Sequence, residues 1–257
     1  MAPALAAAVA GGVAWLAHRA GTLTGSGAVA AWVVGTAVLL GTGWEGGGVL
    51  AAFFVFSNLA GRGAPAPAHL DPKSDRRDHR QVLANGGVAA LVALYGLRDP
   101  ALGHWLLTCA LAAAAADTWA TAFGARSRRP PRLILGGAVV PAGTSGGVTA
   151  LGSSGAAAGA MVVAAAGAAA AGMLALFPVA SLVGFGGMLL DSALGAAAQG
   201  RFRCERCGES SEWRVHRCGA PTVHGGGLAW LDNDGVNLTA SAAAAAAGWL
   251  LWRWLSA

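Results

Sequence analysis

Apolar segments separated by short polar stretches follow one another along almost the whole chain. A helix that crosses a bilayer needs roughly 20 predominantly apolar residues, and by that criterion we count about eight candidate spans. Their expected bounds are 4–17, 27–40, 49–59, 82–97, 102–123, 148–176, 179–198 and 236–255. The pattern predicts an all-α protein, a polytopic integral membrane helical bundle of about seven to eight transmembrane helices. We expect a single domain over residues 1–257.

Three of these spans depart from the usual length. The second and third are short enough to be re-entrant, whereas the sixth is too long for one crossing and contains Gly152, Gly155 and Gly159. Because glycine lowers helix propensity, we expect a break there that leaves the first part of the sixth span outside the hydrocarbon.

The composition agrees with burial in a membrane. Of the 257 residues 55% are hydrophobic and only 11% are charged, a balance that is unusual for a soluble globular domain. The 40 glycines and the alanine runs give the helices small faces, which let backbones approach closely in lipid. A biased genome composition explains the same residues equally well.

Most of the positive charge lies in three loops. The net charge of +5 therefore indicates which loops share a side of the membrane, and it does not point to a nucleic-acid partner. Two spans separate each loop from the next, which puts all three on one side, and the positive-inside rule assigns that side to the cytoplasm. We therefore expect a multi-pass protein of the cell membrane with both termini on the opposite side. The loop cations are Arg62, Lys73, Arg76, Arg77 and Arg80; Arg126, Arg128, Arg129 and Arg132; and Arg201, Arg203, Arg206, Arg214 and Arg217.

Two carboxylates, Asp117 and Asp191, fall inside strongly apolar windows. An isolated charge there costs several kcal/mol, so such residues are functional candidates. Asp117 precedes Arg126 by nine residues and Asp191 precedes Arg201 by ten, which at about 1.5 Å per residue puts each roughly 14 Å from a basic loop. Both belong to the loop-side half of the bundle. The alternative is that they are hydrogen-bonding contacts between helices, either charged or protonated.

Further polar groups are expected at the same level. Oxygen ligands of this kind suit Mg²⁺ held together with substrate phosphates, although Asp and Asn at helix starts also serve as caps. The candidates beside the two aspartates are Thr118, Thr121, Ser192 and Gln199, those at the start of the fourth span are Asp78, Gln81 and Asn85, and those leading into the eighth span are Asp232, Asn233, Asp234 and Asn237.

A glycine-rich turn at residues 141–148 precedes the sixth span. Backbone N–H groups in such a loop, followed by a helix start, can bind an anion, but the Gly-Lys-Thr/Ser of a P-loop is missing, and a plain structural turn is the alternative. Arg77 adds a guanidinium suited to phosphate, or it anchors the loop at the membrane surface. The turn residues are Gly143, Thr144, Ser145, Gly146 and Gly147.

Three of the four cysteines gather in the segment 200–226, as Cys204-x-x-Cys207 and His216-x-Cys218. Cysteine and histidine at such spacing can hold a structural Zn²⁺, and a reducing cytoplasmic side disfavours a disulfide. The His-x-Cys half is tighter than the usual spacing, and His224 could replace His216. Cys109 lies in the fifth span, where we expect an inert buried thiol.

Five motifs, in order between about residue 43 and residue 255, together resemble the transmembrane protein 19 family of integral membrane proteins, also known as domain of unknown function 92. The motifs are Arg77-Asp78-x-x-Gln81-Val82-x-Ala84-Asn85-Gly86-Gly87, Ala116-Asp117-Thr118-Trp119-Ala120-Thr121, Pro141-x-Gly143-Thr144-Ser145-Gly146-Gly147-Val148, Asp191-Ser192-x-Leu194-Gly195-x-x-x-Gln199 and Asp232-Asn233-Asp234-x-Val236-Asn237.

That family includes the plant phytyl-phosphate kinase. The resemblance implies a kinase that converts phytyl or geranylgeranyl monophosphate to the diphosphate with a nucleoside triphosphate, CTP being one candidate donor. One departure is Ala122, where the family often has glutamate.

In the mechanism we expect, Asp117 and Asp191 hold Mg²⁺ together with Asn233 or Asp234. The turn at 143–147 and Arg77 cradle the phosphates, because phosphoryl transfer needs mainly positioning and charge neutralisation. Asn85 is a further expected catalytic residue, and Asn237 a further expected phosphate ligand.

Two other functions remain open. In a transporter or lipid flippase, Asp117 and Asp191 would carry protons or Na⁺ near the bilayer centre. A CTP-dependent cytidylyltransferase acting on a lipid phosphate would use the same metal and loop groups but release pyrophosphate. The sequence leaves the prenyl chain length, the donor and the oligomeric state undetermined.

Overall fold

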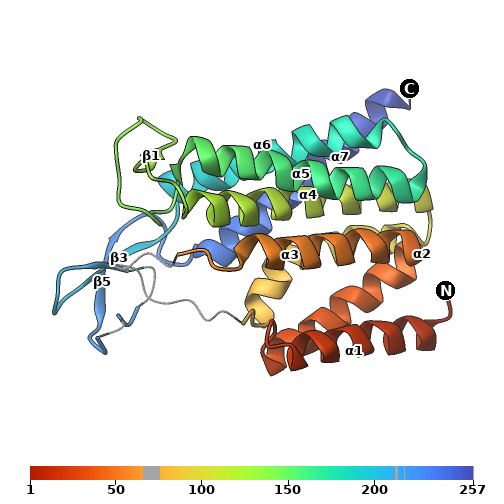
Figure 1. Ribbon diagram of the computed structural model, residues 1–257, viewed down its shortest axis with the longest axis horizontal. Helices are drawn as coiled ribbons and strands as arrows, with labels where there is room; N and C mark the ends of the chain where they lie inside the picture. The colour runs from red at the N-terminus through yellow and green to blue at the C-terminus, as the bar shows by residue number, and fades with distance from the viewer. Residues whose placement is uncertain (66–75, 212–213, 217, 257) are drawn as a thin grey trace.

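The protein is a bundle of long helices with its irregular segments gathered at one end (Figure 1). The computed structural model describes residues 1–65, 76–211, 214–216 and 218–256. Within these residues the helices are α1 (Pro3–Arg19), α2 (Gly25–Gly61), α3 (His79–Tyr95), α4 (Pro100–Gly124), α5 (Ala150–Ala171), α6 (Leu176–Ala197) and α7 (Asn233–Leu255). The predicted helical membrane bundle is confirmed.

Helix α2 folds back on itself at Gly43, whose φ of 65° and ψ of −154° are not helical. Before the bend, Gly41 packs against the backbone of Ala93 near the end of α3. After it, the chain returns to the opposite end, where the backbone oxygen of Arg62 accepts a hydrogen bond from Arg126. The two short spans expected at 27–40 and 49–59 are therefore the antiparallel arms of one bent helix, and the bundle has the eight segments that the apolar pattern predicts.

The expected break in the sixth span is wrong. Helix α5 runs without interruption from Ala150 to Ala171, capped by the Thr149 side chain, and the overlong span divides at the turn before α6. The glycines are contact points: an added Cβ at Gly155 would lie 2.7 Å from Phe123 Cβ, and one at Gly159 would lie 2.8 Å from the Ala115 oxygen. Small residues here let α5 approach the backbone of α4.

Helix α4 forms the centre of the bundle. Its residues 102–116 are all buried, and it packs against α2, α3, α5, α6 and α7. Large apolar side chains on the outer helices face outward instead; Leu91 is 71% exposed and Leu182 is 74% exposed. An apolar outer surface of this kind suits contact with lipid.

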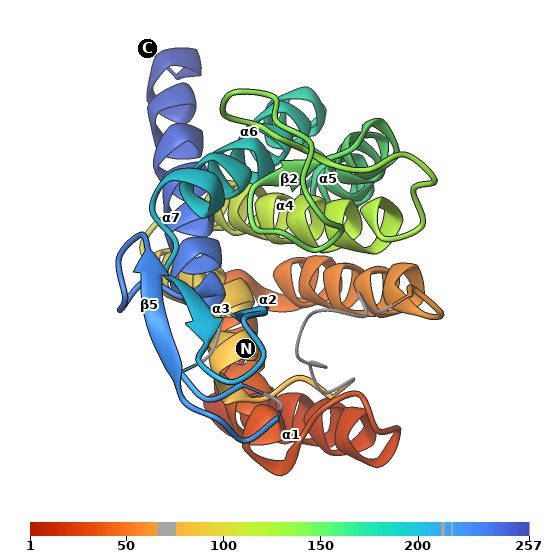
Figure 2. The same cartoon turned by 90° about the vertical axis from the view of Figure 1, so that its left-hand side faces the viewer.

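Among the residues that the structure describes, four helices are long and apolar enough to cross a membrane: α2, α4, α5 and α6. Two segments that contain short strands, one between α4 and α5 and one between α6 and α7, lie at the end of the bundle seen in Figure 2. Strands β1 (Arg132–Leu133) and β2 (Gly147–Val148) pair antiparallel, and a second sheet has the order β4–β3–β5, formed by β3 (Arg201–Cys204), β4 (Ser210–Ser211) and β5 (Thr222–Gly226). The all-α prediction did not include these short strands, which belong to the segments that connect the helices.

Both termini lie at the opposite end from these loops (Figure 1). The three basic loops share one end, as predicted, and among the described residues only Arg98 and Arg253 are cations of the other end. Two predicted loop cations, Lys73 and Arg217, lie outside the described residues.

Candidate functional site

Asp117 and Asp191 lie at the same level of two neighbouring helices. Helices α4 and α6 run in the same direction (Figure 1) and meet closely, since an added Cβ at Gly187 would lie 2.6 Å from Ala113 Cβ. Asp117 follows Ala113 by four residues, and Asp191 follows Gly187 by four. Residues four apart share one face of a helix, so both aspartates lie one turn beyond this contact, on the faces that meet.

The two aspartates lie in the last two turns of their helices. Asp117 is seven residues from the end of α4 and Asp191 six from the end of α6, which corresponds to about 10 Å from the loop end in each case. Both are half-buried, and the Oδ2 atom of Asp191 is shielded from solvent. Asp117 and Asp191 thus lie in the loop-side half of the bundle, as the sequence predicts.

The glycine-rich turn packs against the same face of α6. An added Cβ at Gly195 would lie 3.1 Å from the Gly146 nitrogen and 3.5 Å from Ser145 Cβ. Gly195 follows Asp191 by four residues, so the turn covers the helix one turn above the carboxylate. Gly146 has a φ of 78°, and a side chain there would meet the backbone of Ala196 at 2.6 Å. The close approach of loop and helix therefore depends on glycine at 146.

Helix α7 adds an amide to this face. It runs antiparallel to α6, and an added Cβ at Gly187 would lie 3.7 Å from Ala244 Cβ. Asn237 precedes Ala244 by seven residues and so shares its face, which puts it at the level of Leu194, about one turn from Asp191. Asn237 is half-buried.

The starts of α3 and α7 are joined by Arg80, which hydrogen-bonds to Asp232 and lies 3.8 Å from Asp234. The capping alternative holds for two aspartates: Asp78 accepts from the Gln81 N–H at 3.0 Å, and Asp232 accepts from the Gly235 N–H at 3.0 Å. The expected metal ligand Asp234 therefore shares its carboxylate with an arginine that the sequence had suggested only as a loop charge.

Several predicted ligands make local hydrogen bonds. Thr118 donates to the Ala114 oxygen at 2.8 Å, Thr144 to the Pro141 oxygen at 2.8 Å, and Asn85 to the Gln81 oxygen at 2.9 Å. Their oxygens still have acceptor capacity. Ser192 lies 3.7 Å from the Met188 sulfur.

Three other predicted ligands have distinct surroundings. Gln199 is buried, with only 3% of its surface exposed, beneath residues 227–228, whereas Thr121 is exposed. Arg77 is held through its backbone, which exchanges hydrogen bonds with Thr22 and Thr24 of the α1–α2 turn. Burial lowers the pKa of the Arg77 guanidinium from its ordinary value.

Sequence reasoning missed a cavity of about 370 Å³ between the three-stranded sheet and the bundle. Arg80 and Arg214 bring positive charge to it, and the exposed ring of Trp230 forms part of its wall. These residues are far apart along the chain, and a lone tryptophan or arginine in a loop carries no pattern by which a sequence could reveal their meeting.

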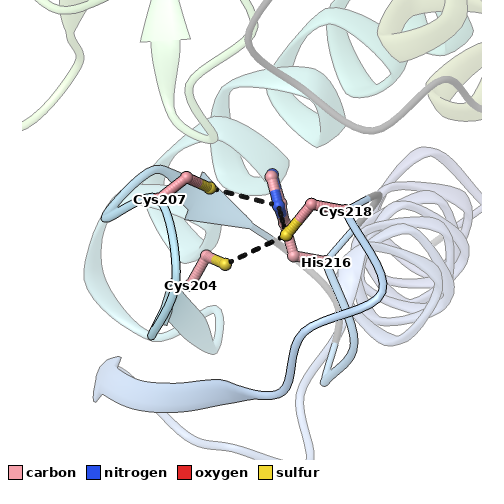
Figure 3. A group of neighbouring side chains, drawn as sticks. All are labelled: Cys204, Cys207, His216 and Cys218. Carbon is pink, nitrogen blue, oxygen red and sulfur yellow. Dashed lines mark hydrogen bonds between the residues drawn. The ribbon is translucent and has the colours of Figure 1, made fainter.

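The second candidate site is a cysteine and histidine cluster in the three-stranded sheet (Figure 3). The ligand atoms of Cys204, Cys207, His216 and Cys218 all lie within 4.8 Å of one another. His216 Nδ1 lies 3.2 Å from Cys218 Sγ and 3.4 Å from Cys207 Sγ. A hydrogen bond from the Cys207 backbone is the main cause that lowers the pKa of Cys204 to about 7.

The structure decides between the two histidines proposed for this cluster. His216 is in it, whereas His224 lies on β5 with its ring against Phe202, at a centroid distance of 5.7 Å. Cys109 is fully buried in α4, as expected for a thiol with a packing role.

Comparison with known proteins finds relatives over most of the chain. The family model described as integral membrane protein DUF92 matches residues 8–245. Protein PGR of Arabidopsis thaliana is 29% identical over 263 residues, which cover 88% of this chain and 87% of that protein. The uncharacterized membrane protein MJ0933 of Methanocaldococcus jannaschii is 27% identical over 188 residues, which cover 72% of this chain and 78% of the relative. No solved structure matches.

Proposed function

The chain belongs to the DUF92 family of integral membrane proteins, as its motifs predicted, and from that premise we propose that it is a prenyl-phosphate kinase. Its substrates would be phytyl or geranylgeranyl monophosphate and a nucleoside triphosphate, with CTP as one candidate donor. The product would be the lipid diphosphate. The cell membrane is the proposed location, with the loop end of the bundle facing the cytoplasm, because that end carries the basic loops.

One observation carries the proposal: two half-buried carboxylates lie on neighbouring helices, and a glycine turn packs on one of these helices, α6, one turn above Asp191. A triphosphate needs divalent-cation ligands and backbone N–H donors side by side. Asp117 and Asp191 are ligands of the oxygen type that Mg²⁺ prefers, and the turn at Gly146 lies one helical turn above Asp191. The donor set therefore fits a cation bound together with phosphate.

In this proposal each group of the chain has a positioning role. Asp117 and Asp191 would hold Mg²⁺, whose charge neutralises the donor phosphates when it is bound. The backbone N–H groups of residues 143–147 would orient the phosphates, and Asn237 would add an amide from α7. The attacking oxygen of a lipid monophosphate is already anionic, so the reaction requires no general base from the protein.

The depth of the aspartates favours this chemistry over transport. A transporter binds its substrate near the bilayer midplane, whereas Asp117 and Asp191 lie in the last two turns of α4 and α6. A lipid phosphate also lies near the membrane surface, at the level of these residues, with its isoprenoid tail among the apolar helices. The resemblance implies a glutamate at position 122, where this chain has an alanine buried at the end of α4, so the proposed site uses one carboxylate fewer.

The test is an assay of purified protein in detergent with geranylgeranyl or phytyl monophosphate, Mg²⁺ and each nucleoside triphosphate in turn. Mass spectrometry of the lipid should find the diphosphate, together with the matching nucleoside diphosphate. Formation of a nucleotidyl lipid and pyrophosphate would contradict the kinase and indicate the cytidylyltransferase instead. The absence of any lipid product with every donor would overturn both and direct work to transport across vesicles.

A further inference from the structure

The segment 201–226 folds as a small lobe that has almost no apolar core. Of its described residues only Cys204, Ser211 and His216 are buried, while Val215 is 61% exposed and Val223 is 49% exposed. Strands this short do not hold together by pairing alone. Small lobes without a core are usually stabilised by a disulfide or a metal.

We propose that Cys204, Cys207, His216 and Cys218 bind one structural Zn²⁺ that holds this lobe together. Cys204 ends β3 and Cys207 lies between β3 and β4, whereas His216 and Cys218 lie between β4 and β5, so the four ligands come from two separate segments of the lobe. Three thiolates and one imidazole form a common closed zinc site.

The spacing of the ligand atoms fits a tetrahedral ion. With Zn–S near 2.3 Å and Zn–N near 2.0 Å, tetrahedral angles separate ligand atoms by about 3.5 to 3.8 Å. The distance is 3.5 Å between the sulfurs of Cys204 and Cys218, and the His216 Nδ1 distances to Cys207 and Cys218 are 3.4 and 3.2 Å. A disulfide needs sulfurs about 2.05 Å apart and would leave the third thiol and the buried imidazole of His216 without a role.

The second nitrogen of His216 supports the same assignment. Its Nε2 atom lies 3.5 Å from the Glu209 carboxylate, while Nδ1 faces the thiols (Figure 3). Zinc-bound histidines commonly donate their other N–H to a carboxylate, which fixes the ring and the tautomer. The Glu209 carboxylate therefore lies beside the N–H that a zinc-bound His216 would carry.

Backbone hydrogen bonds connect the base of the lobe to the bundle, so a zinc ion that keeps the lobe folded would also affect the neighbouring helix ends. The Gly200 N–H donates to the Leu231 oxygen at 2.9 Å, and the Leu228 N–H donates to the Ala198 oxygen at 2.8 Å. These bonds hold the end of α6 against the start of α7, next to Asp232. A folded lobe keeps Phe202 and Arg214 in the wall of the cavity beside Arg80.

The test is to purify the full-length protein without added metal or chelator and to measure its zinc content by inductively coupled plasma mass spectrometry. We expect about one zinc per chain, a loss of most of it in Cys204→Ser and Cys218→Ser, and no change in Cys109→Ala, which removes the thiol outside the lobe. This readout does not depend on the proposed kinase activity, so either can fail alone.

Two further measurements use unaltered protein, so they test the proposal even where the cysteine variants fold poorly. Unaltered protein stripped of zinc and given Co²⁺ should show the visible absorption of tetrahedral cobalt with thiolate ligands. Trypsin should then cleave at Arg203, Arg206 or Arg214 much faster in the metal-free protein than in the zinc-loaded one. Unaltered protein that contains no zinc and binds no Co²⁺ would overturn the proposal, whether or not a disulfide joins two of these cysteines.

Discussion

Asp117 and Asp191 are the residues on which the proposed kinase depends most. Asp117→Asn and Asp191→Asn keep the size and a hydrogen-bonding oxygen but remove the negative charge that a divalent cation requires. We expect each to lower kcat/KM by at least about 100-fold, the effect typical of losing one key electrostatic group. Steady-state kinetics on the lipid phosphate, with the melting temperature in detergent as a check of folding, would measure this.

Glu45→Gln is the matched control, because Glu45 is an exposed carboxylate at the bend of α2, at the opposite end of the bundle. It should leave kcat/KM unchanged. If the two aspartates served only as hydrogen-bonding contacts between helices, asparagine would replace them well. Full activity in either Asp→Asn variant would therefore remove our metal assignment.

Gly146 is the residue at which the phosphate-binding turn can be tested. In Gly146→Ala the new methyl group would meet the Ala196 backbone at 2.6 Å and push the turn off α6. We expect kcat/KM for the nucleotide to fall by about 10- to 100-fold, since small displacements of positioning groups have effects of this size. Gly136→Ala is the control, because its φ of 86° is also positive while no atom lies within 4 Å of the added Cβ. Equal effects in both variants would mean that strain, and not position, matters.

At the scale of helices, the sequence predicted the segments well and the glycines poorly. The bend at Gly43 lies in the gap between two short predicted spans. The break predicted at Gly152, Gly155 and Gly159 is absent, because these glycines belong to a continuous helix that packs against α4. Glycine permits both a positive φ and a close helix contact, and the sequence does not show which neighbour will pack there. Asp117 and Asp191 could be chosen as candidates from the sequence because charge in an apolar window is rare.

The partners of those carboxylates could not be predicted in the same way. Arg80 reaches Asp232 across 152 residues of sequence, and from the sequence His224 remained an alternative to His216 in the cysteine cluster. Each of these contacts depends on how helix ends and strands are placed in space. The order of motifs along the chain contains little information about that placement.

Gly43 allows a stability prediction for the bend of α2. Its φ of 65° and ψ of −154° lie in a region open essentially to glycine alone, so Gly43→Ala should destabilise the protein by about 1–3 kcal/mol. Gly48→Ala, in the same helix with open space around the added Cβ, should be neutral or slightly stabilising because alanine favours helix. Unfolding in mixed detergent micelles would compare the two; a Gly43→Ala variant as stable as Gly48→Ala would contradict the bend.

At the scale of the molecule, the eight segments put both termini at one end and the basic loops at the other (Figure 1). If the loops face the cytoplasm, alkaline phosphatase fused to the C-terminus should be active and a fluorescent protein fused there should be dark. Fusions within the loop after Arg129 should give the opposite pair of results. A fluorescent C-terminal fusion would reverse the proposed orientation of the site.

The burial of α4 has a consequence for how the protein is made. The His104 ring lies 2.9 Å from the Gly167 oxygen, 63 residues later in the chain, and Trp105 donates to the Gly248 oxygen, 143 residues later. When α4 leaves the ribosome, neither of these oxygens has been synthesised. The first turns of the central helix therefore lack these two partners until the second half of the chain has been inserted, so the packing of α4 is completed late.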